Sequence, residues 1–138
     1  MNPVEVAESE TVDITVDQDV VRVRQKMRAL AVTAALSLVD QTKVVTAASE
    51  LARNTLIYGG GGLAVLELVR RSPTKGVRVS FTDKGPGIAD IQLALTDGYT
   101  TGGGLGLGLS GARRLVDEFE LDSTPGEGTR VVITKWGR

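Results

Sequence analysis

The first third of the chain passes from an alternating to a helical pattern of hydrophobic residues. Residues 11–16 alternate polar and apolar side chains, which predicts a strand. Over residues 20–38 the apolar side chains recur three or four positions apart, as they do along one side of a helix. Asp17 and Asp19 precede this stripe, and either carboxylate can cap the helix. Residues 1–10 are largely polar and are expected to form a flexible tail.

The same helical spacing returns once more before the pattern changes to strands. A second helix is predicted over residues 40–58, with Asp40 as its cap. Four consecutive glycines at 59–62 end this helix, because glycine commonly terminates helices. Residues 63–71 and 77–81 then alternate in hydrophobicity and predict two strands joined by a short turn.

The second half of the chain is interrupted by a glycine-rich segment. Residues 89–96 predict a short helix, and the glycine-rich segment covers residues 97–111. A helical pattern follows at 112–119. Two further strands, at 120–123 and 129–136, complete the pattern.

This order of elements predicts the class of fold. Strands that follow one another in pairs indicate a mixed, mainly antiparallel sheet, and the helices between them gather on one face. We therefore expect an α+β protein with the architecture of a two-layer sandwich. Since 138 residues suffice for one core and no linker interrupts them, residues 11–138 are expected to form a single domain.

Composition excludes several classes of function. The net charge of −1 argues against a general nucleic-acid-binding protein. The chain has no cysteine and no histidine, so a zinc site of the usual kind is not expected. The apolar run at 29–39 is too short to span a membrane, and residues 1–10 do not resemble a signal peptide. We expect a cytoplasmic protein that does not bind a membrane.

The glycine-rich segment is the main chemical signal. Six glycines lie between Gly102 and Gly111, directly before the predicted helix. A glycine loop that leads into a helix N-terminus presents backbone N–H groups to a phosphate. The alternative is a flexible linker, but leucines alternate with the later glycines, unlike in a linker. The match of residues 106–111 to the dinucleotide fingerprint is weak because it does not open a βαβ unit, and no Gly-Lys-Ser/Thr of a P-loop occurs.

Three polar residues elsewhere suit the same ligand. Glu50 and Asn54 are four residues apart and share one side of the second helix. Asn54 can give an oxygen ligand to Mg²⁺, and Glu50 can accept a proton from an attacking hydroxyl group. Asp83 stands between a strand and a Gly-Pro-Gly turn. Taken singly, these residues are more often a surface amide or a turn former. Their order together with the glycine loop favours a nucleotide site.

Basic residues follow the exposed side of the first predicted helix, at Arg22, Arg24, Lys26 and Arg28. A row of this kind is usually a solvated helix face. The alternative is a docking surface for an acidic partner.

Four motifs together resemble the GHKL ATPase superfamily, which includes histidine kinases, gyrase-type ATPases and anti-sigma kinases. Residues 50–54 (Glu-Leu-Ala-Arg-Asn) resemble its N-box, and residues 83–88 resemble its first glycine box. Residues 102–108 resemble the second glycine box, and residues 126–129 the last motif. The motifs occur in the family's order, so the match is specific.

The resemblance implies roles for individual residues. Glu50 is expected to be the catalytic base, and Asn54 the ligand of Mg²⁺. Asp83 is expected to accept a hydrogen bond from the adenine amino group, with Gly87 beneath the ring and Thr129 beside it. Gly104, Gly106 and Gly108 are expected to surround the phosphates. The full set implied to bind ATP is Asn54, Asp83, Gly85, Gly87, Ile88, Thr100, Thr101, Gly102, Gly103, Gly104, Leu105, Gly106, Leu107, Gly108 and Thr129.

Within the superfamily the chain is most similar to the switch serine/threonine kinases of bacterial stressosomes. Residues 97–101 (Asp-Gly-Tyr-Thr-Thr), 114–119 (Arg-Leu-Val-Asp-Glu-Phe) and the Lys-Trp pair at 135–136 carry this resemblance. Such kinases phosphorylate STAS-domain antagonist and scaffold proteins and, once released, bind and activate a serine phosphatase. The short segment between the glycine boxes implies a small ATP lid.

Two other functions compete with the kinase. One is a binding module similar to an anti-sigma factor, in which ATP acts only as a conformational ligand. Intact Glu50 and Asn54 favour the kinase, because a degenerate binder needs neither. The other is the detached ATPase domain of a histidine kinase, which the compact chain and short lid disfavour.

Overall fold

A computed structural model describes residues 3–96 and 108–137. Within these residues the elements are β1 (Glu5–Ile14), α1 (Asp17–Thr33), α2 (Leu38–Ile57), β2 (Gly62–Arg71), β3 (Thr74–Asp83), α3 (Ile91–Ala94), α4 (Gly108–Arg114), β4 (Glu118–Thr124) and β5 (Gly128–Trp136).

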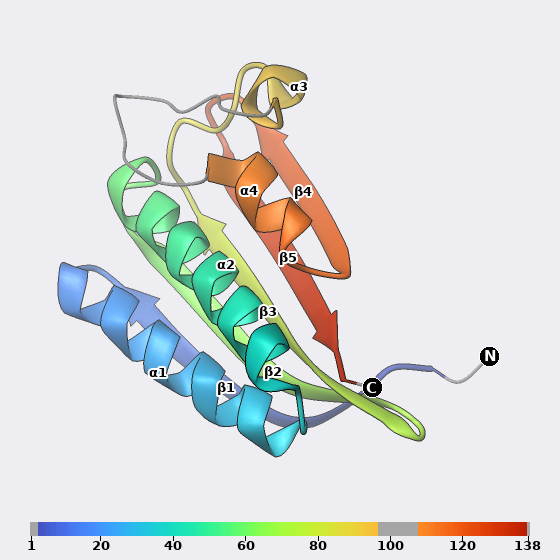
Figure 1. The fold of residues 1–138 in the computed structure, drawn as a ribbon. Coiled ribbons are helices and arrows are strands. Elements are labelled where there is room, and N and C mark those ends of the chain that lie inside the picture. Colours follow the sequence, from blue (N-terminus) through green and yellow to red (C-terminus); the bar gives the residue numbers. More distant parts are fainter. Residues whose placement is uncertain (1–2, 97–107, 138) are drawn as a thin grey trace.

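The strands form one sheet in the order β1-β2-β3-β5-β4, and each pair of neighbours is antiparallel. Helices α1, α2 and α4 cover one face of this sheet, and α3 lies at one end of it (Figure 1). The predicted α+β fold, a two-layer sandwich, is confirmed. The sheet is expected to be mixed, but among the described residues it is antiparallel throughout.

The hydrophobic core lies between the two layers. Because successive side chains of a strand point to opposite faces, every second residue of the central strands contributes to it. Burial of these side chains against the helices is the main force that holds the layers together. The fully buried side chains with the largest volumes include Phe81, Ile14, Met27, Leu51, Leu66 and Ile133.

The N-terminal strand corrects the expected flexible tail. β1 begins at Glu5 and pairs with β2 from its first residue, since Glu5 lies opposite Arg70. The two side chains also form an ion pair of 3.1 Å. Residues 5–11 are exposed, so no buried residues alternate with polar ones there. Without that alternation the sequence carries no periodic signal of the strand.

The boundary between the first two helices also differs from the prediction. α1 ends at Thr33, and α2 begins at Leu38 with Ser37 as its N-cap, whose Oγ accepts a hydrogen bond of 3.1 Å from the Asp40 amide. Asp40 is therefore not the cap. The predicted apolar stripe ran through this turn because Ala34, a buried turn residue, and Leu38, which is 72% exposed on α2, continue the spacing of the helix.

The helix after the glycine-rich segment lies earlier in the chain than the predicted residues 112–119. α4 ends at Arg114, and Phe119 already belongs to β4. Phe119 packs against the core from the strand, which explains why its spacing matched a helix.

Candidate nucleotide-binding site

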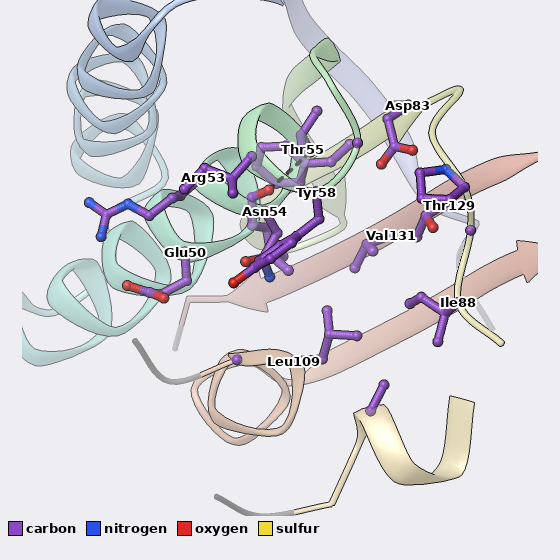
Figure 2. A pocket seen from close by; sticks show the side chains of 18 of the residues that line it. Glu50, Arg53, Asn54, Thr55, Tyr58, Asp83, Ile88, Leu109, Thr129 and Val131 are labelled. Atoms are coloured by element: carbon purple, nitrogen blue, oxygen red, sulfur yellow. Dashed lines mark hydrogen bonds between the residues drawn. The ribbon is translucent and has the colours of Figure 1, made fainter. Parts of the chain in front are cut away.

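A cavity of about 550 Å³ opens between the C-terminal half of α2, the loop after β3 and the start of α4 (Figure 2). Its size is in the range of small-molecule sites. The lining combines an apolar part, which includes Phe81, Ile88, Leu109 and Val131, with polar side chains at its edges. This composition suits a ligand with one flat apolar part and one charged part.

α2 carries the polar residues of one wall. Glu50, Asn54 and Tyr58 follow one another at intervals of four residues, which places them along one side of the helix. All three line the cavity. Figure 2 shows Asn54 and Tyr58 side by side, with Glu50 and Arg53 extending away from them on the outer part of the helix. The predicted carboxylate–amide pair therefore lies at one cavity wall.

Asp83 occupies the opposite end of the cavity, where β3 finishes. Its Oδ1 accepts a hydrogen bond of 2.9 Å from the Gly85 amide, which orients the carboxylate. Gly59, just after α2, packs directly against this side chain, and a Cβ at Gly59 would overlap it. The absence of a side chain at Gly59 thus allows the end of α2 to approach Asp83.

The first glycine box is attached to the turn between β4 and β5. Gly87 has a φ of +75°, and a side chain there would collide with the Thr124 carbonyl. The Ile88 amide donates a hydrogen bond of 2.8 Å to Ser123 Oγ. Ser123 Oγ also lies 2.9 Å from Thr129 Oγ1. These contacts hold Gly87, Ile88 and Thr129 at one edge of the cavity.

The structure brings most of the described site residues together. Glu50, Asn54, Asp83, Gly87, Ile88, Gly108 and Thr129 all line the cavity. Gly85 does not line it, but its amide orients Asp83. The other expected ligand residues lie outside the described residues: Thr100, Thr101, Gly102, Gly103, Gly104, Leu105, Gly106 and Leu107.

Sequence reasoning missed several contributors to the site, among them Tyr58, Arg53 and Ser123. Tyr58 lines the cavity, and its spacing from Asn54 was a signal that could have identified it. Arg53 lies beside Asn54 in the N-box and also lines the cavity. Ser123 contacts a residue 35 positions away, so no local pattern could have revealed its role.

The donor set fits a metal ion that is shared with a ligand. No group of three or more acidic, histidine or cysteine side chains that could hold a metal occurs in the described part of the chain. Mg²⁺ commonly takes one or two protein ligands and completes its shell with phosphate oxygens and water. A single oxygen from Asn54 is consistent with that arrangement.

In the described ranges, 3–96 and 108–137, no helix has the length and apolar character needed to cross a bilayer.

A family model and two known proteins match this chain. Residues 39–136 match the family model described as histidine kinase-, DNA gyrase B-, and HSP90-like ATPase. The chain is 45% identical over 127 residues to the serine/threonine-protein kinase RsbT of Bacillus subtilis (strain 168), covering 92% of this chain and 96% of that protein. It is 31% identical over 116 residues to the anti-sigma F factor of Clostridium novyi (strain NT), covering 77% of this chain and 81% of that protein.

A solved structure shows the same fold. The crystal structure of the RsbU and RsbW domains of Rv1364c from Mycobacterium tuberculosis superposes with a TM-score of 0.63 at 22% sequence identity. The match covers 99% of this chain and 33% of that chain. Residues of the N-box, the first glycine box and the last motif line one cavity, and the family model matches residues 39–136; the chain belongs to the histidine kinase-, DNA gyrase B-, and HSP90-like ATPases.

Proposed function

We propose that this protein transfers phosphate from ATP to serine or threonine side chains of STAS-domain proteins in a bacterial partner-switching, or stressosome, pathway. After release it binds and activates a serine phosphatase. The expected enzyme class, a protein serine/threonine kinase, is confirmed by the 45% identity to RsbT over most of both chains. The STAS-domain substrate and the phosphatase are inferences that go beyond this identity.

The observation that carries the proposal is the position of Glu50 and Asn54 at the same cavity as Asp83. Asp83 and the apolar lining would hold the adenine at one end, with Gly87 and Thr129 beside the ring. The phosphates would then extend toward α2, where Asn54 would hold Mg²⁺, and the glycines up to Gly108 would surround them.

The end of the cavity at α2 would then carry out the phosphoryl transfer. Mg²⁺ would neutralise the charge that develops on the phosphates during transfer. Glu50 would accept the proton of the attacking hydroxyl group, since a positioned carboxylate can act as a general base. The protein would contribute mainly position and electrostatic stabilisation, as is usual in phosphoryl transfer.

A binding module is the second candidate, because the chain is also 31% identical to an anti-sigma F factor. In that function ATP would act only as a conformational ligand. The two candidates differ in whether covalent phosphate appears on the partner.

The first experiment identifies the chemical bond. Purified STAS-domain proteins are incubated with the enzyme and ATP labelled on its γ-phosphate. Transfer to serine or threonine gives an acid-stable ester on the partner. An acid-labile adduct alone would contradict the proposed substrate chemistry.

Variants of the second helix separate the kinase from the binding module. Asn54→Ala should keep partner binding but reduce phosphorylation by orders of magnitude, because the metal loses its protein ligand. Glu50→Gln should lower the rate by about 10²–10⁴-fold if the carboxylate is the base. Both variants should then stay bound to the partner in the presence of Mg-ATP, which co-elution on a sizing column measures. If they dissociate on adding Mg-ATP as readily as wild type, ATP acts as an allosteric ligand and the binding module is the correct function.

A further inference from the structure

The basic residues of α1 fall into two groups in the structure. Arg22 pairs with Asp19 at 3.2 Å, and Lys26 pairs with Glu10 at 2.6 Å. Arg24 and Arg28 have no carboxylate partner among the described residues. Two of the four charges are therefore used within the fold, and two remain available to a partner.

One of the two available charges, Arg24, contacts α2. Arg24 Nη2 lies 3.4 Å from Ser49 Oγ, so these residues mark where the outer sides of the two helices meet. A tight turn joins the end of α1 to the start of α2, and the helices therefore run in opposite directions (Figure 1). Arg28 follows Arg24 by four residues along α1 and therefore lies nearer the connection between the two helices. Arg53 follows Ser49 by four residues along α2, in the direction of the nucleotide cavity. Arg53 is one of the residues that line this cavity.

Arg53 adds a third cation to the row. Its guanidinium extends away from Asn54 and Tyr58, on the outer part of α2 (Figure 2). Like Arg24 and Arg28, it forms no ion pair with any residue in the described part of the chain. The row of guanidinium groups thus begins at the cavity and runs toward the turn between the helices.

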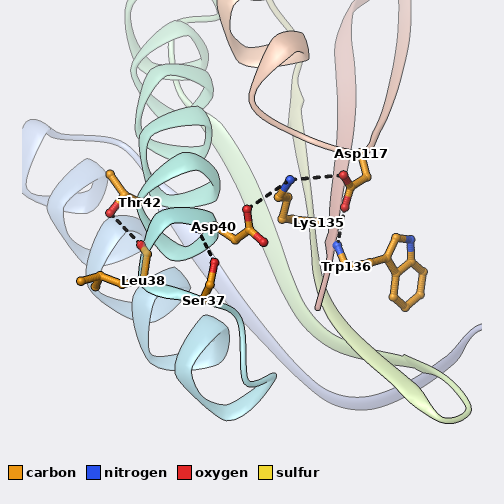
Figure 3. Close-up of polar contacts among 7 residues, drawn as sticks. All are labelled: Ser37, Leu38, Asp40, Thr42, Asp117, Lys135 and Trp136. Atoms are coloured by element: carbon orange, nitrogen blue, oxygen red, sulfur yellow. Dashed lines mark hydrogen bonds and ion pairs between the residues drawn. The ribbon is translucent and has the colours of Figure 1, made fainter. Parts of the chain in front are cut away.

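Exposed hydrophobic side chains continue the row at the turn. Val32 follows Arg28 by one helical turn and is 60% exposed. Leu38 and Val39 begin α2 and are 72% and 64% exposed. Figure 3 shows Leu38 directed away from the buried contacts of Asp40 and Lys135. Neighbouring exposed apolar residues of this kind are typical of protein interaction sites.

We propose that Arg24, Arg28, Arg53, Val32, Leu38 and Val39 form a docking surface, the α1–α2 surface, for the protein that accepts the phosphate. The occupant presents carboxylates to the guanidinium groups and apolar side chains to the three hydrophobic residues. This inference rests on the proposed kinase function and names how that kinase recognises its substrate.

Two features select this occupant. The guanidinium groups lack internal carboxylates, so an acidic protein surface supplies the missing charge. Arg53 makes the surface continuous with the cavity, so a protein docked along it places a hydroxyl group near the phosphate end. Nucleic acid would supply negative charge but would leave the three hydrophobic side chains without a partner.

The first test reverses two charges outside the nucleotide cavity. The probe is the purified STAS-domain protein that accepts phosphate from wild type. Arg24→Glu combined with Arg28→Glu should raise KM for this protein about tenfold or more and leave kcat at saturating substrate nearly unchanged. The affinity for ATP should not change, because neither residue lines the cavity.

The matched control reverses two charges on the sheet. Arg70→Glu combined with Arg130→Glu changes the net charge equally, and both side chains are about half exposed. This control should leave KM near the wild-type value. An equal rise of KM in both double variants would show a general charge effect and overturn the proposal, as would no rise in the α1–α2 variant.

A second test locates the partner directly. The chain has no cysteine, so Val39→Cys provides a single thiol for a photo-crosslinker. Cross-linking to an acidic segment of the STAS-domain protein is expected. Arg130→Cys places the thiol on the sheet face away from the helices and should give little cross-linking to the STAS-domain protein. Cross-linking between two copies of this chain instead would identify the surface as a self-association site and overturn the proposal. If wild type phosphorylates no STAS-domain protein, the proposed function itself is wrong, and with it the identity of the occupant.

Discussion

At the scale of single residues, Asp83 illustrates how the fold orients a carboxylate at the edge of a cavity. One oxygen, Oδ1, accepts the Gly85 amide at 2.9 Å. Gly59 leaves room for the carboxylate beside the end of α2. The orientation of Asp83 is therefore set by backbone groups, and in the proposed function its other oxygen accepts a hydrogen bond from the adenine amino group.

Replacing Asp83 by Asn tests that assignment while keeping the local fold. The amide oxygen of Asn can still accept from Gly85, but the charged acceptor is lost. A hydrogen bond to a charged group contributes about 1.5–3 kcal/mol, so affinity for ATP should fall about ten- to a hundredfold. Calorimetric titration measures the change, with Asp122→Asn on the exposed strand β4 as the control. If the Asp83→Asn variant binds ATP with unchanged affinity, Asp83 does not contact the adenine.

Asp19 predicts a dependence of stability on pH. The amides of Thr15 and Val16 donate to its Oδ2 at 2.9 and 3.1 Å, and these bonds hold the pKa of Asp19 below its ordinary value of 3.8. The unfolded chain then binds more protons in acid, so this stabilisation is complete above the ordinary pKa and is lost as the pH falls through the lowered pKa.

The corresponding experiment compares wild type with Asp19→Asn in denaturant at several pH values. Wild type should be more stable near neutral pH, and the difference should shrink as the pH falls below 3.8. Asp13→Asn, at an exposed residue of β1, serves as the control. A difference between wild type and Asp19→Asn that stays constant down to low pH would show that the charge of Asp19 is not the cause.

At the scale of elements, Lys135 connects three segments of the chain (Figure 3). Its ammonium group, on β5, lies 3.6 Å from Asp40 on α2 and 3.2 Å from Asp117, just before β4. Asp117 also accepts from the Trp136 amide at 2.7 Å. The Lys135 side chain is only 8% exposed, so screening by water is weak here. The contact fixes the start of the helix that carries Glu50 and Asn54 relative to the sheet.

Removing this ammonium group should destabilise the fold. Lys135→Met leaves two carboxylates without their cation, and we expect a loss of about 2–3 kcal/mol, below the cost for a fully buried pair because Asp117 is partly exposed. Asp122→Asn breaks the exposed pair with Arg130 and should cost less than about 0.5 kcal/mol. Chemical denaturation measures the free energy of unfolding of both variants. Equal small losses in the two variants would show that the Lys135 contact contributes little to folding.

At the scale of the whole molecule, β1 closes one edge of the sheet. Its first residues are exposed on both faces, so their contribution comes from backbone pairing with β2 rather than from burial. Without them the edge of β2 would present unpaired backbone groups, and such edges promote aggregation.

A truncation distinguishes this strand from the tail that the polar composition suggested. A chain that begins at Thr11 should unfold at a temperature lower by at least about 4 °C, which corresponds to roughly 1 kcal/mol in a domain of this size. It should also aggregate more readily. A chain that begins at Val4 keeps all of β1 and serves as the control. Equal melting temperatures for the two truncations would mean that residues 5–10 behave as a tail.

The sequence alone was sufficient for the architecture and for much of the site. The spacing of apolar residues predicted the helices and most strands, because one side of each element is buried in a single core. Glu50, Asn54 and Asp83, which line one cavity, could be predicted to share a site because their motifs are local: each occupies a short segment whose order along the chain is specific. The pattern misled where burial and secondary structure separate, as in the exposed residues 5–10 and in the buried turn residue Ala34.

Tertiary structure alone decided how distant segments meet. The contacts of Ser123 with Ile88, of Gly59 with Asp83 and of Lys135 with Asp40 join residues with no common local pattern. The ion pair of Lys26 on α1 with Glu10 on β1 is of the same kind, whereas the pair of Arg22 with Asp19 is local to α1. Local periodicity encodes which side of an element is buried, whereas the partners of a polar side chain are set by chain segments that only folding brings together.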